Sequence, residues 1–246
     1  MAVNNKLVKA QEQERPKELV EYASNGETVK ISPALIRKYL VSSGGNSNVT
    51  VTDGEVNMFL YLCRFQHLNP FIREAYLIKY SNNSPATMVV GKDVFLKRAK
   101  KDPTFAGFQA GIIVEDNETG DLTEREGTFY NPQTENILGG WAKVFVKGYD
   151  VPFYTSVPFS EYVGRKGNGE VNGQWASKPA TMIRKVALAQ ALKEAFPEQN
   201  SGMNAQEEIP EVSDMVLETE AVVVPEETTE EPVEERPADV AASIFG

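Results

Sequence analysis

The feature that most constrains the fold of this chain is a change of composition after Pro197. From Glu198 to Gly246 the sequence holds 14 acidic residues and one basic residue, Arg236, and its only aromatic residue is Phe245. Such a segment buries too little apolar surface to offset the roughly 1–2 kcal/mol of backbone entropy that each ordered residue costs. We therefore predict a folded body followed by a disordered acidic tail over 200–246.

The acidic segment hides the charge of the predicted body. The whole chain has a net charge of −10 and a pI of about 4.8. Residues 198–246 contribute −13, whereas residues 1–197 hold 24 basic and 21 acidic residues, a net charge of +3. A basic body joined to an acidic segment is a recognised hint of nucleic-acid contact.

Composition excludes several classes of protein. The chain has 41% hydrophobic and 24% charged residues, as soluble globular proteins do, and no run of about 18 apolar residues that would span a membrane. Residues 1–15 lack the apolar stretch of a secretory signal. The single cysteine, Cys63, rules out an internal disulfide, and the single histidine, His67, is predicted to end a helix without a catalytic role. We expect a cytoplasmic protein that is not a common hydrolase.

Periodicity and turn residues predict an α+β body, an antiparallel β-meander packed by helices at either end. Thr52 and Glu55 fit a capping box at the start of one helix. Helices are predicted at about 34–41, 52–69, 93–101 and 178–196, and strands at 76–80, 86–90, 108–114, 125–130, 140–147 and 153–159. An N-terminal helical or oligomerisation segment is expected over 1–50.

The motifs of nucleotide-driven and nuclease chemistry are missing from the sequence. It has no G-x-x-x-x-G-K-[ST] phosphate loop, and no Asp or Glu is followed two positions later by Lys, as in the commonest nuclease strand motif. A metal-dependent nuclease site would have to be built from scattered carboxylates such as Asp93, Glu115 and Asp116. We therefore predict no catalytic residue, no metal and no cofactor.

The strand Gly140 to Lys147 carries two different faces. Ala142, Val144 and Val146 suit a core. The other face interleaves aromatic and basic side chains, which are Trp141, Lys143, Phe145 and Lys147. Single-strand binding platforms are built this way, with cations near phosphates and rings against bases. The alternative is an amphipathic strand whose lysines are solvated and whose rings pack under a loop.

Two helical segments add basic residues. In the predicted helix at 93–101, Lys97, Arg98 and Lys101 share one stripe, opposite an apolar face. In the last helix, Arg184 falls on an Ala/Leu face, where an unpaired charge is costly, so it is either a buried ion-pair partner or part of a groove for an anion. The candidate DNA-binding residues are Lys92, Lys97, Arg98, Lys101, Trp141, Lys143, Lys147, Arg165, Lys166, Lys178, Arg184 and Lys185.

Three stretches of the chain carry motifs that occur together in one family of proteins. The first is L-N-P-F-I-R-E-A-Y at 68–76, and the second is the segment Gly91–Arg98 followed by F-A-G-F at 105–108. The third and most specific combines W-A-S-K-P at 175–179, M-I-R at 182–184 and A-F-P at 195–197. With these motifs the chain resembles the phage single-strand-annealing recombinases of the RecT/Redβ (Bet) family, and the similarity spans roughly residues 53–200.

The resemblance implies a function and a set of partners. Members of this family bind single-stranded DNA, anneal complementary strands into a duplex intermediate without ATP, and form oligomeric rings or filaments. They act in phage homologous recombination with a partner exonuclease. For this chain the resemblance implies a β-β-β-α annealing core over 51–199, a homo-oligomer, a host single-strand-binding protein as a second partner, and a phage or prophage protein working in the bacterial cytosol. The acidic tail replaces the small helical module that often ends Redβ.

Two other classes of function stay open on the residues alone. An acidic-tailed chaperone would show no salt-sensitive DNA binding, and a metal-dependent nuclease would degrade labelled DNA. Mixing two complementary oligonucleotides with the protein and no ATP separates both from an annealing protein.

Overall fold

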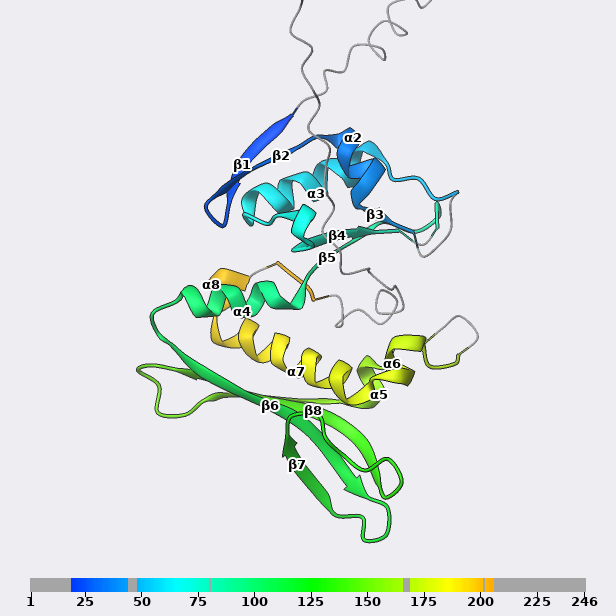
Figure 1. Cartoon of the computed structure of the whole chain (residues 1–246), viewed down its shortest axis with the longest axis vertical. Helices are drawn as coiled ribbons and strands as arrows, with labels where there is room; N and C mark the ends of the chain where they lie inside the picture. Colours follow the sequence, from blue (N-terminus) through cyan, green and yellow to red (C-terminus); the bar gives the residue numbers. More distant parts are fainter. Residues whose placement is uncertain (1–18, 44–47, 80, 166–168, 201, 206–246) are drawn as a thin grey trace, which may run out of the picture.

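A computed structural model describes residues 19–43, 48–79, 81–165, 169–200 and 202–205 of the chain. Figure 1 shows two small sheets and helix α3 at one end of the molecule and a larger sheet at the other, with helices α4 and α7 between them. The predicted α+β class is confirmed. Among the described residues, no helix combines the length and the apolar character needed to cross a membrane.

The described chain begins with a β-hairpin, where a helical segment over 1–50 is predicted. Strands β1 (Val20–Ser24) and β2 (Glu27–Ile31) pair antiparallel. The turn between them, Asn25-Gly26, has positive φ at both residues (51° and 88°), as the preferred two-residue hairpin turn requires. Alternate β2 residues are buried, which is the period of a strand. The turn chemistry and this period favour strands at 20–31, whereas residues 1–18 of the predicted segment lie outside the described residues.

The short helix predicted at 34–41 follows the hairpin as two short helical turns. Ser32 caps helix α2 (Pro33–Leu35), and the chain continues as a π-helical turn, η1 (Ile36–Leu40), into β3 (Val41–Ser42).

Helix α3 (Asp53–Phe65) begins at the predicted capping box. The Thr52 hydroxyl accepts the Glu55 N–H, and the Glu55 carboxylate accepts the Thr52 N–H. The same carboxylate lies 2.8 Å from the buried Lys79 ammonium and accepts the Ala86 N–H. Burial raises the pKa of Glu55, but these hydrogen bonds, led by that of Lys79, outweigh it and hold the pKa at about 2. The pair joins the start of α3 to the second small sheet.

That second sheet follows α3 in the chain. A short 3-10 helix, η2 (Pro70–Ile72), leads into β4 (Ala75–Ile78), which pairs antiparallel with β5 (Thr87–Val90) and parallel with β3. Helix α4 (Lys92–Lys101) then crosses to the larger sheet.

The larger sheet is antiparallel but is not a meander. It contains β6 (Phe105–Asp116), β7 (Leu122–Glu126), β8 (Glu135–Val146) and β9 (Phe153–Pro158), in the order β7-β6-β8-β9. A meander would place β7 between β6 and β8. Instead the two long strands pair with each other, because both bury alternate apolar residues, and the mostly exposed, charged β7 takes the edge. β7 ends at Glu126, and the Gly127 N–H that follows it donates to the Ala110 carbonyl of β6. The strand predicted at 125–130 therefore lies earlier in the chain.

Helix α7 (Pro179–Ala195) covers the inner face of this sheet, together with α5 (Phe159–Tyr162) and α6 (Gly173–Ser177) (Figure 1). Its buried residues surround the helix on several sides, because the sheet lies on one side and α4 and the short helix α8 (Pro197–Asn200) lie on the other. The helix therefore belongs to the core.

The packed chain continues past the boundary predicted at residue 200. Asn200, Met203 and Ala205 are buried, and the Val90 N–H donates to the Asn204 carbonyl at 2.9 Å. These residues pack against the edge of β5, in a part of the chain that the composition predicts to be disordered. The rest of the predicted acidic tail, residues 206–246, lies outside the described residues.

Candidate nucleic-acid interface

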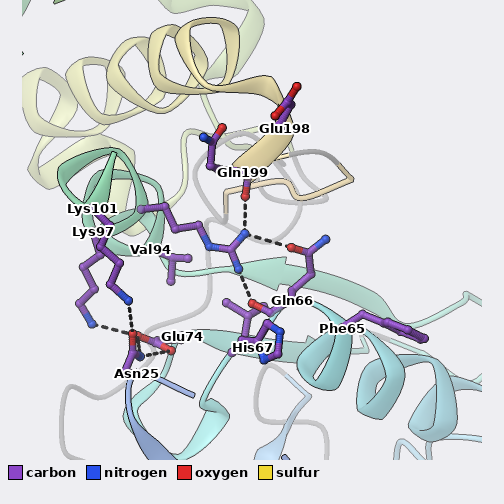
Figure 2. Close-up of a pocket in the computed structure, with 12 residues that line it drawn as sticks. Asn25, Phe65, Gln66, His67, Glu74, Val94, Lys97, Lys101, Glu198 and Gln199 are labelled. Carbon is purple, nitrogen blue, oxygen red and sulfur yellow. Dashed lines mark hydrogen bonds and ion pairs between the residues drawn. The ribbon is translucent and has the colours of Figure 1, made fainter. Parts of the chain in front are cut away.

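A cavity of about 370 Å³ opens at the seam between helix α4 and the N-terminal part of the molecule. Figure 2 shows Lys97 and Lys101 on one wall and Phe65, at the end of α3, on the opposite wall. We call this cavity the seam pocket. Its walls carry three basic side chains, Lys97, Arg98 and Lys101, against two acidic ones, Glu74 and Glu198.

The base of the seam pocket is organised around a buried carboxylate, that of Glu74. It accepts the Asn69 N–H at 2.9 Å, the Asn25 side-chain amide at 3.0 Å and the Lys97 ammonium at 3.0 Å. The Glu74 side chain is 5% exposed, whereas that of Lys97 is 51% exposed. Glu74 thus fixes the ammonium of Lys97 at the pocket wall while leaving half of the side chain open to solvent.

Lys101 lies one helical turn beyond Lys97 on the same face of α4. Its ammonium donates to the Asn25 side-chain oxygen at 3.0 Å, and the residue is exposed. Four residues of an α-helix rise about 6 Å, so the two lysines present two cations side by side along the pocket wall. The structure therefore brings these two predicted residues together as the sequence predicts.

Arg98 has a different role from its neighbours. Its guanidinium donates to the Gln66 side-chain oxygen at 3.0 Å and to the backbone carbonyls of Gln66 and Gln199. Burial lowers its pKa. Arg98 therefore joins the end of α3 to α8 across the seam, and its donors point at protein carbonyls.

The aromatic wall of the seam pocket is absent from the predicted site. Phe65 is 76% exposed and packs against Tyr61, with ring centroids 6.3 Å apart, and Met58 is exposed on the same helix. The opposite face of α3 is buried and contains Val56, Phe59, Leu60 and Cys63. The sequence signal for this wall was a helix with apolar residues on both faces. One apolar face is enough to pack a helix on the core, so the second face is free to contact a ligand.

The outer face of the larger sheet differs from the predicted platform. Trp141 is only 5% exposed, and its indole N–H has no hydrogen-bond partner among the described residues. The Lys143 ammonium lies 4.9 Å from the Trp141 ring centre, 5.4 Å from that of Tyr154 and 3.9 Å from the Glu124 carboxylate. The edge strand β7 supplies Glu124, so this lysine is held among rings beside a negative charge.

The remaining predicted residues are spread over other surfaces. Lys147 is exposed and donates to the Pro103 carbonyl at 2.9 Å, and Lys92 pairs with Asp93 at the start of α4. Arg165 donates to the Gly169 carbonyl at 3.0 Å, and Lys178 is exposed before α7. Lys166 lies outside the described residues.

Arg184 and Lys185 complete the set on α7. The Arg184 Nε–H donates at 3.1 Å to the Ala110 carbonyl, and Lys185 is half-buried. Hydrogen bonding to the sheet explains how a cation is tolerated on the Ala/Leu face of the helix.

Comparison with known proteins decides the family. The model of the RecT family matches residues 27–224, which is most of the chain. The chain belongs to the RecT family. This membership implies single-strand annealing in DNA recombination and binding to single-stranded DNA. RecT proteins are annealing proteins rather than typical enzymes. An uncharacterized protein of Ureaplasma parvum serovar 3 is 25% identical over 193 residues, covering 78% of this chain and 76% of that protein.

The RecT-like stretches read from the sequence are structural supports of the seam. In the first, the Asn69 side chain accepts the Phe71 N–H and so caps η2, which places Glu74 at the pocket base. In the second, the Gly91 N–H donates to the Glu74 carbonyl, and a side chain at Gly91 would meet the Arg73 carbonyl at 2.8 Å. Both stretches therefore hold the start of α4 against the Glu74 loop.

The third RecT-like stretch anchors α7. Asn172 caps α6 by accepting the Trp175 N–H at 3.0 Å, and the buried Trp175 ring meets Phe159 edge-on at 5.4 Å. At the other end of the helix, Phe196 packs against Phe105 with ring centroids 6.0 Å apart. These contacts fix α7 on the sheet and α8 at the seam.

Proposed function

We propose that this RecT-family chain anneals complementary DNA strands without ATP and holds single-stranded DNA across the seam pocket. The observation that supports the site is that Lys97 and Lys101 of α4 line the same pocket as the exposed Phe65 of α3 (Figure 2). Single-strand binding surfaces combine these two features, because cations attract the backbone and rings stack on bases of any sequence.

In this proposal the lysines hold the phosphates. Lys97 and Lys101 lie about 6 Å apart along α4, so a strand running along the helix places successive phosphates near both. Each ammonium already has a polar partner, Glu74 or Asn25, that fixes its position. A fixed cation loses less side-chain entropy on binding than a free one.

The aromatic pair carries the bases. The Phe65 ring faces solvent and is supported from one side by Tyr61. Stacking uses the face of a base and leaves its pairing edge free, so a second strand is able to test complementarity. No nucleotide hydrolysis is needed, since base pairing is itself favourable.

We propose that the other predicted residues contact DNA outside the seam pocket. Lys92, Arg165, Lys178, Arg184 and Lys185 lie away from the pocket on α4, the Gly-rich loop and α7, where they suit a strand that extends beyond the seam. Lys143, held between Trp141 and Tyr154, is proposed to contribute least.

A homo-oligomer on DNA, as a ring or filament, is part of the proposal. Each chain offers few phosphate contacts, and an array adds them along one strand. We further propose a phage or prophage protein that works in the bacterial cytosol with a partner exonuclease and a host single-strand-binding protein. The acidic segment beyond Ala205 is the proposed site of regulation or partner contact.

The experiment compares annealing rates of two complementary labelled oligonucleotides, without ATP, for four variants. Lys101→Gln and Phe65→Ala alter the pocket. Lys100→Gln and Met58→Ala are their matched controls, because each lies exposed on the same helix but does not line the pocket.

We expect both pocket variants to anneal more slowly and both controls to match the unmodified chain. Lys101→Gln should also lower the salt dependence of the affinity for single-stranded DNA, by about 0.7 in the slope of log K against log salt. Equal loss in the pocket variants and the controls would reject the seam as the site. Metal-dependent loss of the label would point to a nuclease.

A further inference from the structure

A second exposed aromatic residue stands beside the basic end of α4. Tyr149, in the turn between β8 and β9, is 63% exposed. Its ring packs against Phe153 with centroids 5.2 Å apart and planes tilted by 59°. The ring is therefore exposed yet supported from behind, as Phe65 is by Tyr61.

Lys147 ties this turn to the end of α4. Its N–H donates to the Thr104 carbonyl at 2.7 Å, and its ammonium donates to the Pro103 carbonyl at 2.9 Å. Pro103 follows Lys101 by two residues, so Lys147 stands next in line after Lys101. Figure 1 shows the β8–β9 turn and the end of α4 on the same side of the molecule.

We propose that Tyr149 is a second base-stacking position and that Lys147 holds the phosphate beside it. This inference rests on the proposed function, because it extends the strand that crosses the seam pocket. The track runs from Phe65 past Lys97 and Lys101 to Lys147 and Tyr149. It has an aromatic ring at each end and lysines between.

The position of the lysines favours DNA over a protein as the ligand of Tyr149. Lys101 and Lys147 supply positive charge at and just beyond the end of α4, and an aromatic ring beside cations suits a base with its phosphate. The contact with Phe153 also limits the motion of the Tyr149 ring, so this ring loses less freedom on binding than an unsupported one. Val151, which is 72% exposed at the same turn, supplies an apolar side chain without a stacking face.

The test measures the affinity of Tyr149→Ala, Tyr149→Phe and Val151→Ala for oligothymidylates of about 4 to 16 nucleotides. Val151→Ala is the matched control, because it removes exposed apolar surface from the same turn. For Tyr149→Ala we expect normal affinity for the shortest strands and a loss of about 5- to 150-fold for those long enough to reach the turn, the range that one stacked base contributes. Tyr149→Phe, which keeps the ring, should bind like the unmodified chain.

Three results would overturn the inference. The first is that Tyr149→Ala binds like the unmodified chain at every strand length. The second is that Val151→Ala loses as much affinity as Tyr149→Ala. The third is that Tyr149→Ala changes self-association, measured by sedimentation, without changing the affinity for DNA. The last result would assign the turn to a contact with a second copy. Failure of the proposed function is separate: it appears as unchanged binding of Lys101→Gln to the shortest strands.

Discussion

Replacing Arg98 by methionine tests whether this residue is a DNA contact or a brace between two parts of the molecule. The side-chain stem is kept, and only the guanidinium is lost. That group donates to three acceptors on two elements, namely the side chain and carbonyl of Gln66 and the carbonyl of Gln199. The structure therefore predicts loss of stability as the main effect.

The size of the effect follows from those contacts. A hydrogen bond to a charged group contributes about 1.5–3 kcal/mol, and the acceptors freed at the edge of an open pocket regain part of this from water. We expect Arg98→Met to lower the free energy of unfolding by about 2–4 kcal/mol. For a chain of this size that corresponds to a fall in Tm of roughly 4–16 °C.

Thermal unfolding followed by circular dichroism measures this change. Lys100→Met, an exposed residue on the same helix, is the control and should stay within about 0.5 kcal/mol of the unmodified chain. Below the lowered Tm, Arg98→Met should keep the salt dependence of DNA binding. An unchanged Tm together with a slope reduced by about 0.7 would refute the reasoning and make Arg98 a phosphate contact, as its sequence position suggests.

Three further outcomes are expected. Arg184→Ala should weaken DNA binding and lower the free energy of unfolding by only about 1 kcal/mol, the contribution of the hydrogen bond to the Ala110 carbonyl. A variant that fails to fold would show that Arg184 has a structural role only. The folded pKa of Glu55 is lowered to about 2, so the stability from its pair with Lys79 is present above pH 4.5 and lost toward pH 2. Glu55→Gln should therefore reduce the difference between the thermal unfolding midpoints measured at pH 7 and at pH 2. Truncation after Ala205 should leave annealing intact and tighten DNA binding at low salt; weaker binding would contradict competition by the acidic segment.

The elements that the sequence predicts well are those with local signals. The capping box of Thr52 and Glu55 starts α3, and the basic stripe of Lys97 and Lys101 faces outward as the helical period requires. The hairpin that was not predicted also has a local signal, the Asn25-Gly26 turn. The expectation of a helical segment there did not take this turn into account.

The surroundings of other predicted residues depend on contacts that no local pattern encodes. The carbonyls bound by Arg98 lie 32 and 101 residues away in the chain. Trp141 shares its strand face with Lys143, as predicted, but is buried, and the edge strand β7, which lies beyond β6 in the sheet, places Glu124 beside that lysine. Periodicity fixes which residues share a face, but the neighbours of that face come from the tertiary fold.

Photocrosslinking tests the central claim, that single-stranded DNA lies across the seam, most directly. An oligonucleotide carrying bromodeoxyuridine would be irradiated with the full chain, and the attached peptides identified by mass spectrometry. The account predicts attachment at Phe65 or Tyr61 at the end of α3. Attachment confined to Trp141 and Tyr154, on the outer face of the sheet, would contradict it and place the DNA on the strand face where aromatic and basic residues alternate.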